Sequence, residues 1–272
     1  MNDPLLKLSL FRHSDNLYLV HLHEIVLSFV FYQFILYPII APWLNKLFFG
    51  KHYTELESRK TKLNFDIHTV SMFQCILSLV LIYPILFTPL SLNIATYYDP
   101  YSSLVSSLTM GYFMWDLCVC LRHFSLFGVG FLGHACASLF VFYSTLRPFC
   151  QSWVGKFLIF EASTPFVNIN WYISQLSRTS SKPVVPAWFN VLNGILLIGV
   201  FFLVRIVWGF TAILLLLREM WKVWDQVPQW LLLSIIGINI LLDSLNVFWL
   251  SKMIKIAKKL ASGNSSGSGK RE

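Results

Sequence analysis

The feature that most constrains this chain is a series of apolar blocks, each about 20 residues long, which as α-helices would cross ~30 Å of hydrocarbon. Hydrophobic residues make up 56% of the sequence and charged residues only 12%, about half the charged fraction of a typical soluble domain. The blocks cover residues 24–48, 67–89, 102–121, 127–146, 149–172, 188–217 and 229–251. We therefore predict an all-α polytopic membrane protein with about seven transmembrane helices.

The distribution of Lys and Arg predicts the orientation, because cytosolic loops carry an excess of these residues. Seven spans place fourteen of them on one side, mainly in the loop 46–62 and after residue 251, and five on the other side. We therefore predict a luminal N-terminus and a cytosolic C-terminus. The net charge of +8 comes with no DNA- or RNA-binding motif, so no nucleic-acid partner is predicted.

The chain divides into three predicted parts. Residues 1–59 hold an N-terminal arm, the first transmembrane helix and a basic cytosolic loop; residues 60–260 form the main helical domain; residues 261–272 form a disordered Gly/Ser tail. All five cysteines lie in or beside apolar blocks, and the Cys-x-Cys at 118–120 lacks the ligand spacing of a zinc site. We predict no disulfide, no metal site and no cofactor.

One block is much more polar than the others: residues 157–171 read FLIFEASTPFVNINW. A carboxylate such as that of Glu161 costs roughly 3 kcal/mol in the middle of a membrane helix, so we expect it to face protein, water or a ligand. Pro165 has no backbone N–H to donate. We expect this proline to leave the carbonyl group of Glu161 free and to open the helix beside the acid.

Helix rise places several ionisable residues at one depth. Glu161 lies 14 residues after Arg147 and His134 lies 13 residues before it, and the tight corner there predicts antiparallel neighbouring helices with both side chains at one level. The same reasoning, applied from the predicted cytosolic helix ends, adds Asp116, Asp243 and Asn246. This band, in the cytosolic half of the membrane, predicts a polar pocket.

Two groups of candidate site residues are drawn from this band and from other polar residues inside the predicted spans. His134, Glu161 and Asp116 are the candidate catalytic residues, because a histidine can act as general base or transient acyl acceptor while a carboxylate orients it and stabilises its charge. The candidate substrate-binding residues are Asn168, Arg205, Asp243 and Asn246. Structural alternatives stay open: a buried hydrogen-bonded His134, an ion pair of Arg205 with Glu161 or Asp243, Asp116 binding a neighbouring helix, and asparagines that join helices.

Five segments together resemble the TLC domain, which is shared by the translocating-chain-associated membrane protein, ceramide synthases and a lipofuscinosis protein. They are GYFMWDL (111–117), GHACASLFVFY (133–143), FEASTPFVNINW (160–171), NGILLIGVFFLVRI (193–206) and LLDSLNVFWLSKMIKI (241–256). The closest similarity is to small TLC domain-containing proteins with an E-x-S-T/S-P-F-V-N-x-x-W motif. The resemblance implies that the last six helices form a TLC-type bundle around a lipid-accessible polar cavity, in the endoplasmic reticulum or a related membrane.

The resemblance also sets the functional hypotheses. Ceramide synthases carry a His-His pair in the equivalent helix, whereas here Gly133 precedes His134; their acidic position in the next helix corresponds to Glu161. We expect a protein that acts in lipid homeostasis or membrane lipid composition by binding or sensing a membrane lipid, which could be a sphingolipid, a phospholipid or a fatty-acyl species. The alternative is an acyl-CoA-dependent acyltransferase related to ceramide synthase that uses His134, with acyl-CoA as co-substrate. A channel or transporter is disfavoured, because the polar band is one-sided and no inverted repeat is visible.

Overall fold

The computed structural model describes residues 2–179 and 183–267, and every regular element within these ranges is a helix. The all-helical fold predicted from hydropathy is therefore confirmed. Lys182, in a loop predicted to be cytosolic, and residues 268–272 of the predicted disordered tail lie outside the described residues. Residues 261–267 of that tail continue the last helix, α12.

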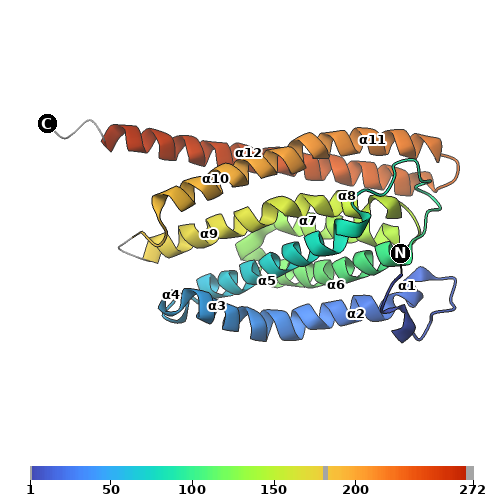
Figure 1. Ribbon diagram of the computed structural model, residues 1–272, viewed down its shortest axis with the longest axis horizontal. Helices are drawn as coiled ribbons and strands as arrows, with labels where there is room; N and C mark the ends of the chain where they lie inside the picture. Colours follow the sequence, from blue (N-terminus) through green and yellow to red (C-terminus); the bar gives the residue numbers. More distant parts are fainter. Residues whose placement is uncertain (1, 180–182, 268–272) are drawn as a thin grey trace.

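Most helices follow one another with short connections, and a longer one joins η3 to α6 (Figure 1). The N-terminal elements are η1 (Leu6–Leu8), α1 (Leu17–Val20), α2 (Leu22–Val30), η2 (Phe31–Ile40), α3 (Ala41–Phe49) and α4 (Lys51–Thr54). The central elements are α5 (Arg59–Ile82), η3 (Tyr83–Ile85), α6 (Pro100–Arg122), α7 (Phe124–Thr145), η4 (Gln151–Trp153), α8 (Val154–Leu158), η5 (Ile159–Ser163) and α9 (Thr164–Thr179). The last elements are α10 (Ala187–Phe201), η6 (Phe202–Val207), α11 (Trp208–Lys222) and α12 (Gln229–Gly267).

Six helical segments are long and apolar enough to cross a membrane: Leu22–Phe49, Arg59–Ile85, Pro100–Arg122, Phe124–Thr145, Ala187–Lys222 and Gln229–Lys259. The remaining predicted span, 149–172, is helical but broken into η4, α8, η5 and α9, of which the longest has 16 residues. Figure 1 shows α8 and α9 running lengthwise beside the other helices, with α1 near one end of the bundle and the C-terminal part of α12 at the other.

The second membrane segment begins earlier than predicted. We expected this segment to begin at residue 67, but α5 already starts at Arg59. The Oγ of Ser58 accepts a hydrogen bond from the backbone N–H of Thr61 at 3.3 Å, which caps the first turn. Hydropathy missed this turn, because a capped helix can extend beyond the apolar block with charged residues on its surface.

The centre of the bundle is α6, the most buried of the candidate spans. Its contact with α2 is very close: a Cβ at Gly111 would lie 2.4 Å from the Cβ of Ser28. The Ser28 hydroxyl donates to the backbone carbonyl of Leu108 at 2.6 Å. Small residues let helix backbones approach in this way in membrane proteins. The first membrane segment is therefore tightly packed against the main helical domain.

A polar network joins α3, α4, α5 and α9 near one end of the bundle. The Asp66 carboxylate accepts from the Asn45 amide at 2.9 Å and from the Tyr53 hydroxyl at 2.8 Å. The Thr69 hydroxyl lies 2.7 Å from both Asn45 Oδ1 and the Tyr172 hydroxyl. Burial and the bond to Asp66 raise the pKa of the Tyr53 phenol, so it stays a donor at neutral pH. This network is structural and holds the four elements together.

Candidate functional site

A cavity lies between α7, η5, η6 and α12. Its polar lining consists of His134, Ser138, Glu161, Arg205, Asn239, Asp243 and Asn246, and its apolar walls include Phe113, Phe142, Phe157 and Phe160. The cavity is partly open, and its volume is small, about 60 Å³, which is enough for a few water molecules. The cavity can hold a polar group of a ligand, but not a whole lipid molecule.

Arg205 is the best-connected polar residue of the cavity. Its Nε donates to Ser163 Oγ at 2.9 Å, and its terminal nitrogens donate to Asn246 Oδ1 at 3.4 Å and Thr164 Oγ1 at 3.5 Å. It lies in the π-helical turn η6, a distortion that is frequent at functional sites. Within the described ranges no carboxylate oxygen lies within 4.0 Å of it.

The lack of a carboxylate near Arg205 tests the structural alternative that this residue forms a buried ion pair. An ion pair of Arg205 with Glu161 or Asp243 is not formed, although all three side chains line the same cavity. The guanidinium group instead rests on neutral oxygen atoms and on the ring of Phe201, 5.4 Å from its centroid. Its positive charge therefore stays available to an anionic or strongly polar group of a ligand.

The helix around Glu161 differs from the expectation. Pro165 was expected to leave the Glu161 carbonyl free, but the backbone N–H of Thr164 bonds to it. Residues 159–163 form a 3₁₀-helix, whose bonds span three residues instead of four. The prediction of a free carbonyl is therefore wrong: the chain satisfies the carbonyl by tightening the helix. The tightened turn carries the Glu161 side chain to the cavity.

His134 contributes a nitrogen atom with no protein partner. Its ring meets Phe113 and Trp249 edge-on, with centroids 6.2 and 6.0 Å away. Its Nδ1 is buried and makes no hydrogen bond with the part of the chain that the structure covers. This observation disfavours the structural alternative of a satisfied buried histidine. A lone pair or a proton is available at the cavity wall.

The polar face of α12 completes the lining. A Cβ at Gly209 would lie 2.9 Å from Asp243 Oδ1, so the glycine of α11 makes room for this carboxylate. Sequence reasoning selected Asp243 and Asn246 but missed Asn239 and, on α7, Ser138. Both follow the helical repeat, because Asn239 lies four residues before Asp243 and Ser138 four after His134.

Two predicted site residues do not line the cavity. Asn168 links helices: its Oδ1 lies 2.7 Å from His68 Nδ1, and its amide donates to Ser71 Oγ at 3.2 Å. Asp116 accepts a weak bond from Cys120 Sγ at 4.0 Å within α6. Asp116 was predicted at the depth of the cavity, but positions around a helix project in different directions, so a common depth was not enough to bring its side chain there.

The corner at Arg147–Pro148 was expected to make α7 and the following helix antiparallel neighbours. The backbone of α7 packs mainly on α6 and also contacts α12. Its side chain Phe142 belongs to the same hydrophobic cluster as Leu158 of α8. His134 on α7 and Glu161 on η5 line the same cavity.

These features define a class of protein: a polytopic helical membrane protein with a small polar cavity inside its bundle. The family model described as the TLC domain matches residues 64–255. The chain therefore belongs to the TLC domain family, as its motifs suggested.

Curated relatives support the same assignment. The chain is 54% identical to "Topoisomerase I damage affected protein 4" of Saccharomyces cerevisiae, over 96% of this chain and 93% of that protein. It is 37% identical to an uncharacterized TLC domain-containing protein of Schizosaccharomyces pombe, over 89% and 81% of the two chains. It is 32% identical to human TLC domain-containing protein 4, over 56% of each chain. No solved structure matches the chain.

Proposed function

We propose that this protein acts in lipid homeostasis or membrane lipid composition by binding or sensing a membrane lipid through the cavity of His134, Glu161, Arg205 and Asp243. The observation that carries the proposal is the mixed lining of the cavity: charged groups of both signs and the aromatic rings of Phe113, Phe142, Phe157 and Phe160 line the same space. A lipid likewise combines a polar head with an apolar body.

The charges of the cavity favour a head group with more than one polar function. Arg205 has no carboxylate within 4.0 Å, so it fits a phosphate or carbonyl oxygen. Glu161 and Asp243 fit an ammonium or hydroxyl group on the same ligand. A space of about 60 Å³ accepts such a group, while the acyl chains would lie along the apolar surface outside. Sphingolipids and phospholipids combine these features.

Lipid that co-purifies with the full-length protein tests the proposal. We expect mass spectrometry of the detergent-purified protein to identify one lipid class enriched over the surrounding membrane. Arg205→Gln and Glu161→Gln should each reduce its occupancy at least tenfold, because a hydrogen bond to a charged group contributes about 1.5–3 kcal/mol. Glu57→Gln is the matched control, since this carboxylate is exposed in a loop. Equal lipid composition in all four proteins would contradict the proposal.

We infer that the protein resides in the endoplasmic reticulum membrane with a luminal N-terminus and a cytosolic C-terminus. The excess of Lys and Arg in the segments assigned to the cytosol supports the orientation, and the resemblance to the TLC domain is the ground for the choice of membrane. In sealed microsomes, added protease should remove a C-terminal epitope tag and leave an N-terminal tag intact. The opposite protection pattern would reverse the orientation.

One observation favours a second candidate function, acyl-CoA-dependent acyl transfer. The unpartnered Nδ1 of His134 could take a proton from an acceptor amine as the amine nitrogen attacks the thioester carbon. The C–S bond then breaks, an amide forms, and the histidine returns the proton to the sulfur, which leaves as the CoA thiol. Purified protein given labelled acyl-CoA and a long-chain base should then form labelled amide, and His134→Gln should abolish the product. Lipid binding without product formation would leave the first proposal in place and reject this one.

A further inference from the structure

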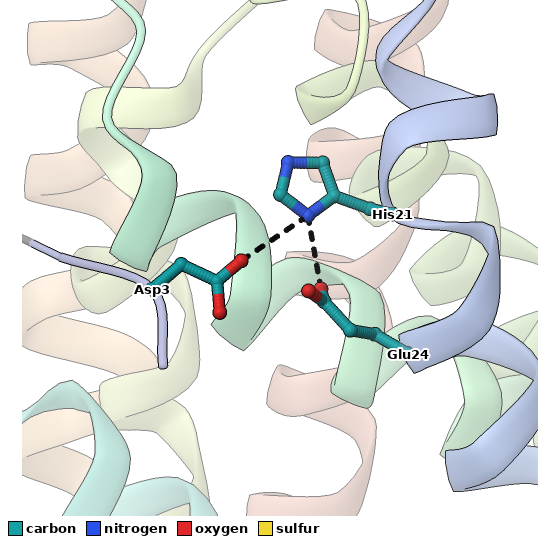
Figure 2. A group of neighbouring side chains, drawn as sticks. All are labelled: Asp3, His21 and Glu24. Atoms are coloured by element: carbon teal, nitrogen blue, oxygen red, sulfur yellow. Dashed lines mark hydrogen bonds and ion pairs between the residues drawn. The ribbon is translucent and has the colours of Figure 1, made fainter. Parts of the chain in front are cut away.

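A second buried polar cluster lies at the N-terminal end of the bundle, away from the cavity. It consists of Asp3 in the N-terminal arm, His21 just before α2 and Glu24 in the first turn of α2. The side chains of all three have no exposed surface. One potential ligand atom from each lies within 4.8 Å of the others. Figure 2 shows both carboxylates directed at the same imidazole nitrogen.

The local structure orients the Asp3 carboxylate. Its Oδ1 accepts from the backbone N–H groups of Leu5 at 2.8 Å and Leu6 at 3.2 Å. Its Oδ2 therefore turns to the cluster, 3.6 Å from His21 Nδ1. This oxygen is buried and makes no hydrogen bond with any described residue. The arm thus presents one fixed, unsatisfied oxygen atom to the cluster.

The first turn of α2 supplies the other two groups. His21 Nδ1 lies 3.0 Å from Glu24 Oε2. The second oxygen, Oε1, is buried without a hydrogen-bond partner among the described residues, although His23 Nε2 lies 3.5 Å away. His23 also bonds the backbone carbonyl of Leu5 at 2.9 Å, so it ties the arm to the same turn. Two oxygen atoms and one nitrogen atom converge on a single point.

The two buried carboxylates of this cluster would be stabilised by a bound cation. Buried carboxylates are costly unless they are paired or coordinate a metal. Across the described ranges no Lys or Arg forms an ion pair with Asp3 or Glu24. One imidazole nitrogen faces both acids, and Asp3 Oδ2 and Glu24 Oε1 are buried without a hydrogen-bond partner among the described residues. A divalent ion at the centre would balance both charges.

We propose that Asp3, His21 and Glu24 bind a divalent transition-metal ion of the Zn²⁺ type, through Asp3 Oδ2, His21 Nδ1 and the Glu24 carboxylate. The donor set of one imidazole and two carboxylates suits Zn²⁺, which takes three protein ligands and an open fourth position in many sites. The imidazole disfavours Ca²⁺ and Mg²⁺, which prefer oxygen-only ligands. His23 would orient the Glu24 carboxylate from outside the ligand set.

The proposed ion would fasten the N-terminal arm to the first membrane helix, since its ligands come from both. This region lies outside residues 64–255, which match the TLC domain, and shares no lining residue with the cavity. The metal site is therefore independent of the proposed lipid function, and either proposal can fail without the other.

Metal binding to the full chain tests the inference. The protein, purified in detergent without a histidine tag, should contain about one zinc per chain by elemental analysis, or bind one when titrated with Zn²⁺. Asp3→Asn keeps an oxygen for Leu5 and Leu6 but replaces the ligand oxygen with an amide nitrogen, so the fold is preserved. We expect Asp3→Asn and His21→Gln each to weaken Zn²⁺ binding more than 100-fold, since loss of an outer partner alone costs 10–100-fold.

Asp15→Asn is the matched control, because this aspartate lies exposed in the same arm. It should bind Zn²⁺ as the wild type does, and Ca²⁺ should compete in neither protein. Melting temperature provides a second readout: Zn²⁺ should raise it in the wild type and in Asp15→Asn but not in Asp3→Asn. No binding in the wild type, or unchanged affinity in Asp3→Asn and His21→Gln, would overturn the inference, as would equal affinity for Ca²⁺.

Discussion

The central cavity and the N-terminal cluster are both buried groups of ionisable side chains, yet only one of them was visible in the sequence. His134, Glu161, Arg205 and Asp243 interrupt apolar blocks, where a charge is costly and therefore conspicuous. Asp3 lies in a polar arm and His21 and Glu24 at the edge of a block, where such residues are ordinarily solvated. The contrast shows that a polar residue is informative in a sequence only when its surroundings make it expensive.

The two regions also differ in how their charges are balanced. The cavity contains a cation, Arg205, held by neutral oxygens beside two carboxylates, and has space left over for a ligand. The N-terminal cluster has two carboxylates around one imidazole and no exposed side-chain surface. We therefore assign a lipid head group to the first and a metal ion to the second.

We expect the largest loss of stability and of zinc binding when the first membrane helix is forced away from the bundle. Gly111→Leu places a side chain where a Cβ alone would lie 2.4 Å from Ser28, so α2 must move from α6, and this shift should distort the start of α2 that holds His21 and Glu24. We expect a loss of about 3 kcal/mol or more in stability and loss of zinc binding, measured by thermal unfolding in detergent and metal titration. Gly130→Ala, with open space around it, should behave as the wild type. Stable Gly111→Leu protein with intact zinc binding would disprove the close packing.

Removing the metal should affect the N-terminal cluster and leave the central cavity unchanged. At a free Zn²⁺ concentration of 100 times the dissociation constant, bound metal stabilises by about 2.7 kcal/mol, and a chelator should remove this increment from the wild type. Lipid occupancy in the cavity should stay unchanged, because the two sites share no residue. Mass spectrometry and thermal unfolding of the same samples measure both. Loss of lipid upon chelation would show that the regions are coupled.

Arg205→Lys should reduce lipid binding in the cavity and leave zinc binding at the N-terminal cluster unchanged. An ammonium group has no planar fork and cannot reach Ser163, Thr164 and Asn246 together. We expect about 1.5 kcal/mol less stability and roughly tenfold less bound lipid, with zinc affinity unchanged. Arg218→Lys is the control, because its side chain is largely exposed. If lysine proves equivalent at position 205, the guanidinium geometry has no role.

We expect the smallest change in stability and zinc affinity when one hydrogen bond of the N-terminal arm is removed and the proposed metal ligands are kept. Ser9 donates to the backbone carbonyl of Val20 at 2.6 Å, so Ser9→Ala should cost about 1 kcal/mol. Zinc affinity should fall by roughly fivefold, since the arm must be ordered again on binding. The lipid content of the cavity should not change. A drop in zinc affinity as large as that of Asp3→Asn would show that arm docking, and not ligand chemistry, controls the site.

Much of the fold followed from hydropathy, and part of the cavity followed from helix geometry. The apolar blocks correspond to helices, and the residues selected at one depth include His134, Glu161, Asp243 and Asn246, which line one space. Depth alone failed for Asp116, because the rotation of its helix was unknown. It also failed to find Asn239, which a search along the face of α12 would have shown. Pro165 signalled a break, but its form, a 3₁₀ turn, depended on which donor replaced the lost bond.

Hydrophobicity and helix length are local properties, so the residues alone were enough to specify a multi-pass helical protein and a costly carboxylate at Glu161. The direction in which each helix faces its neighbours depends on contacts between distant segments, such as Ser28 against Gly111. Packing therefore decided that Arg205 rests on Ser163 instead of an acid. It also decided that Asp3 meets His21 and Glu24. No periodic pattern in the sequence predicts that a polar arm folds back onto the end of a helix.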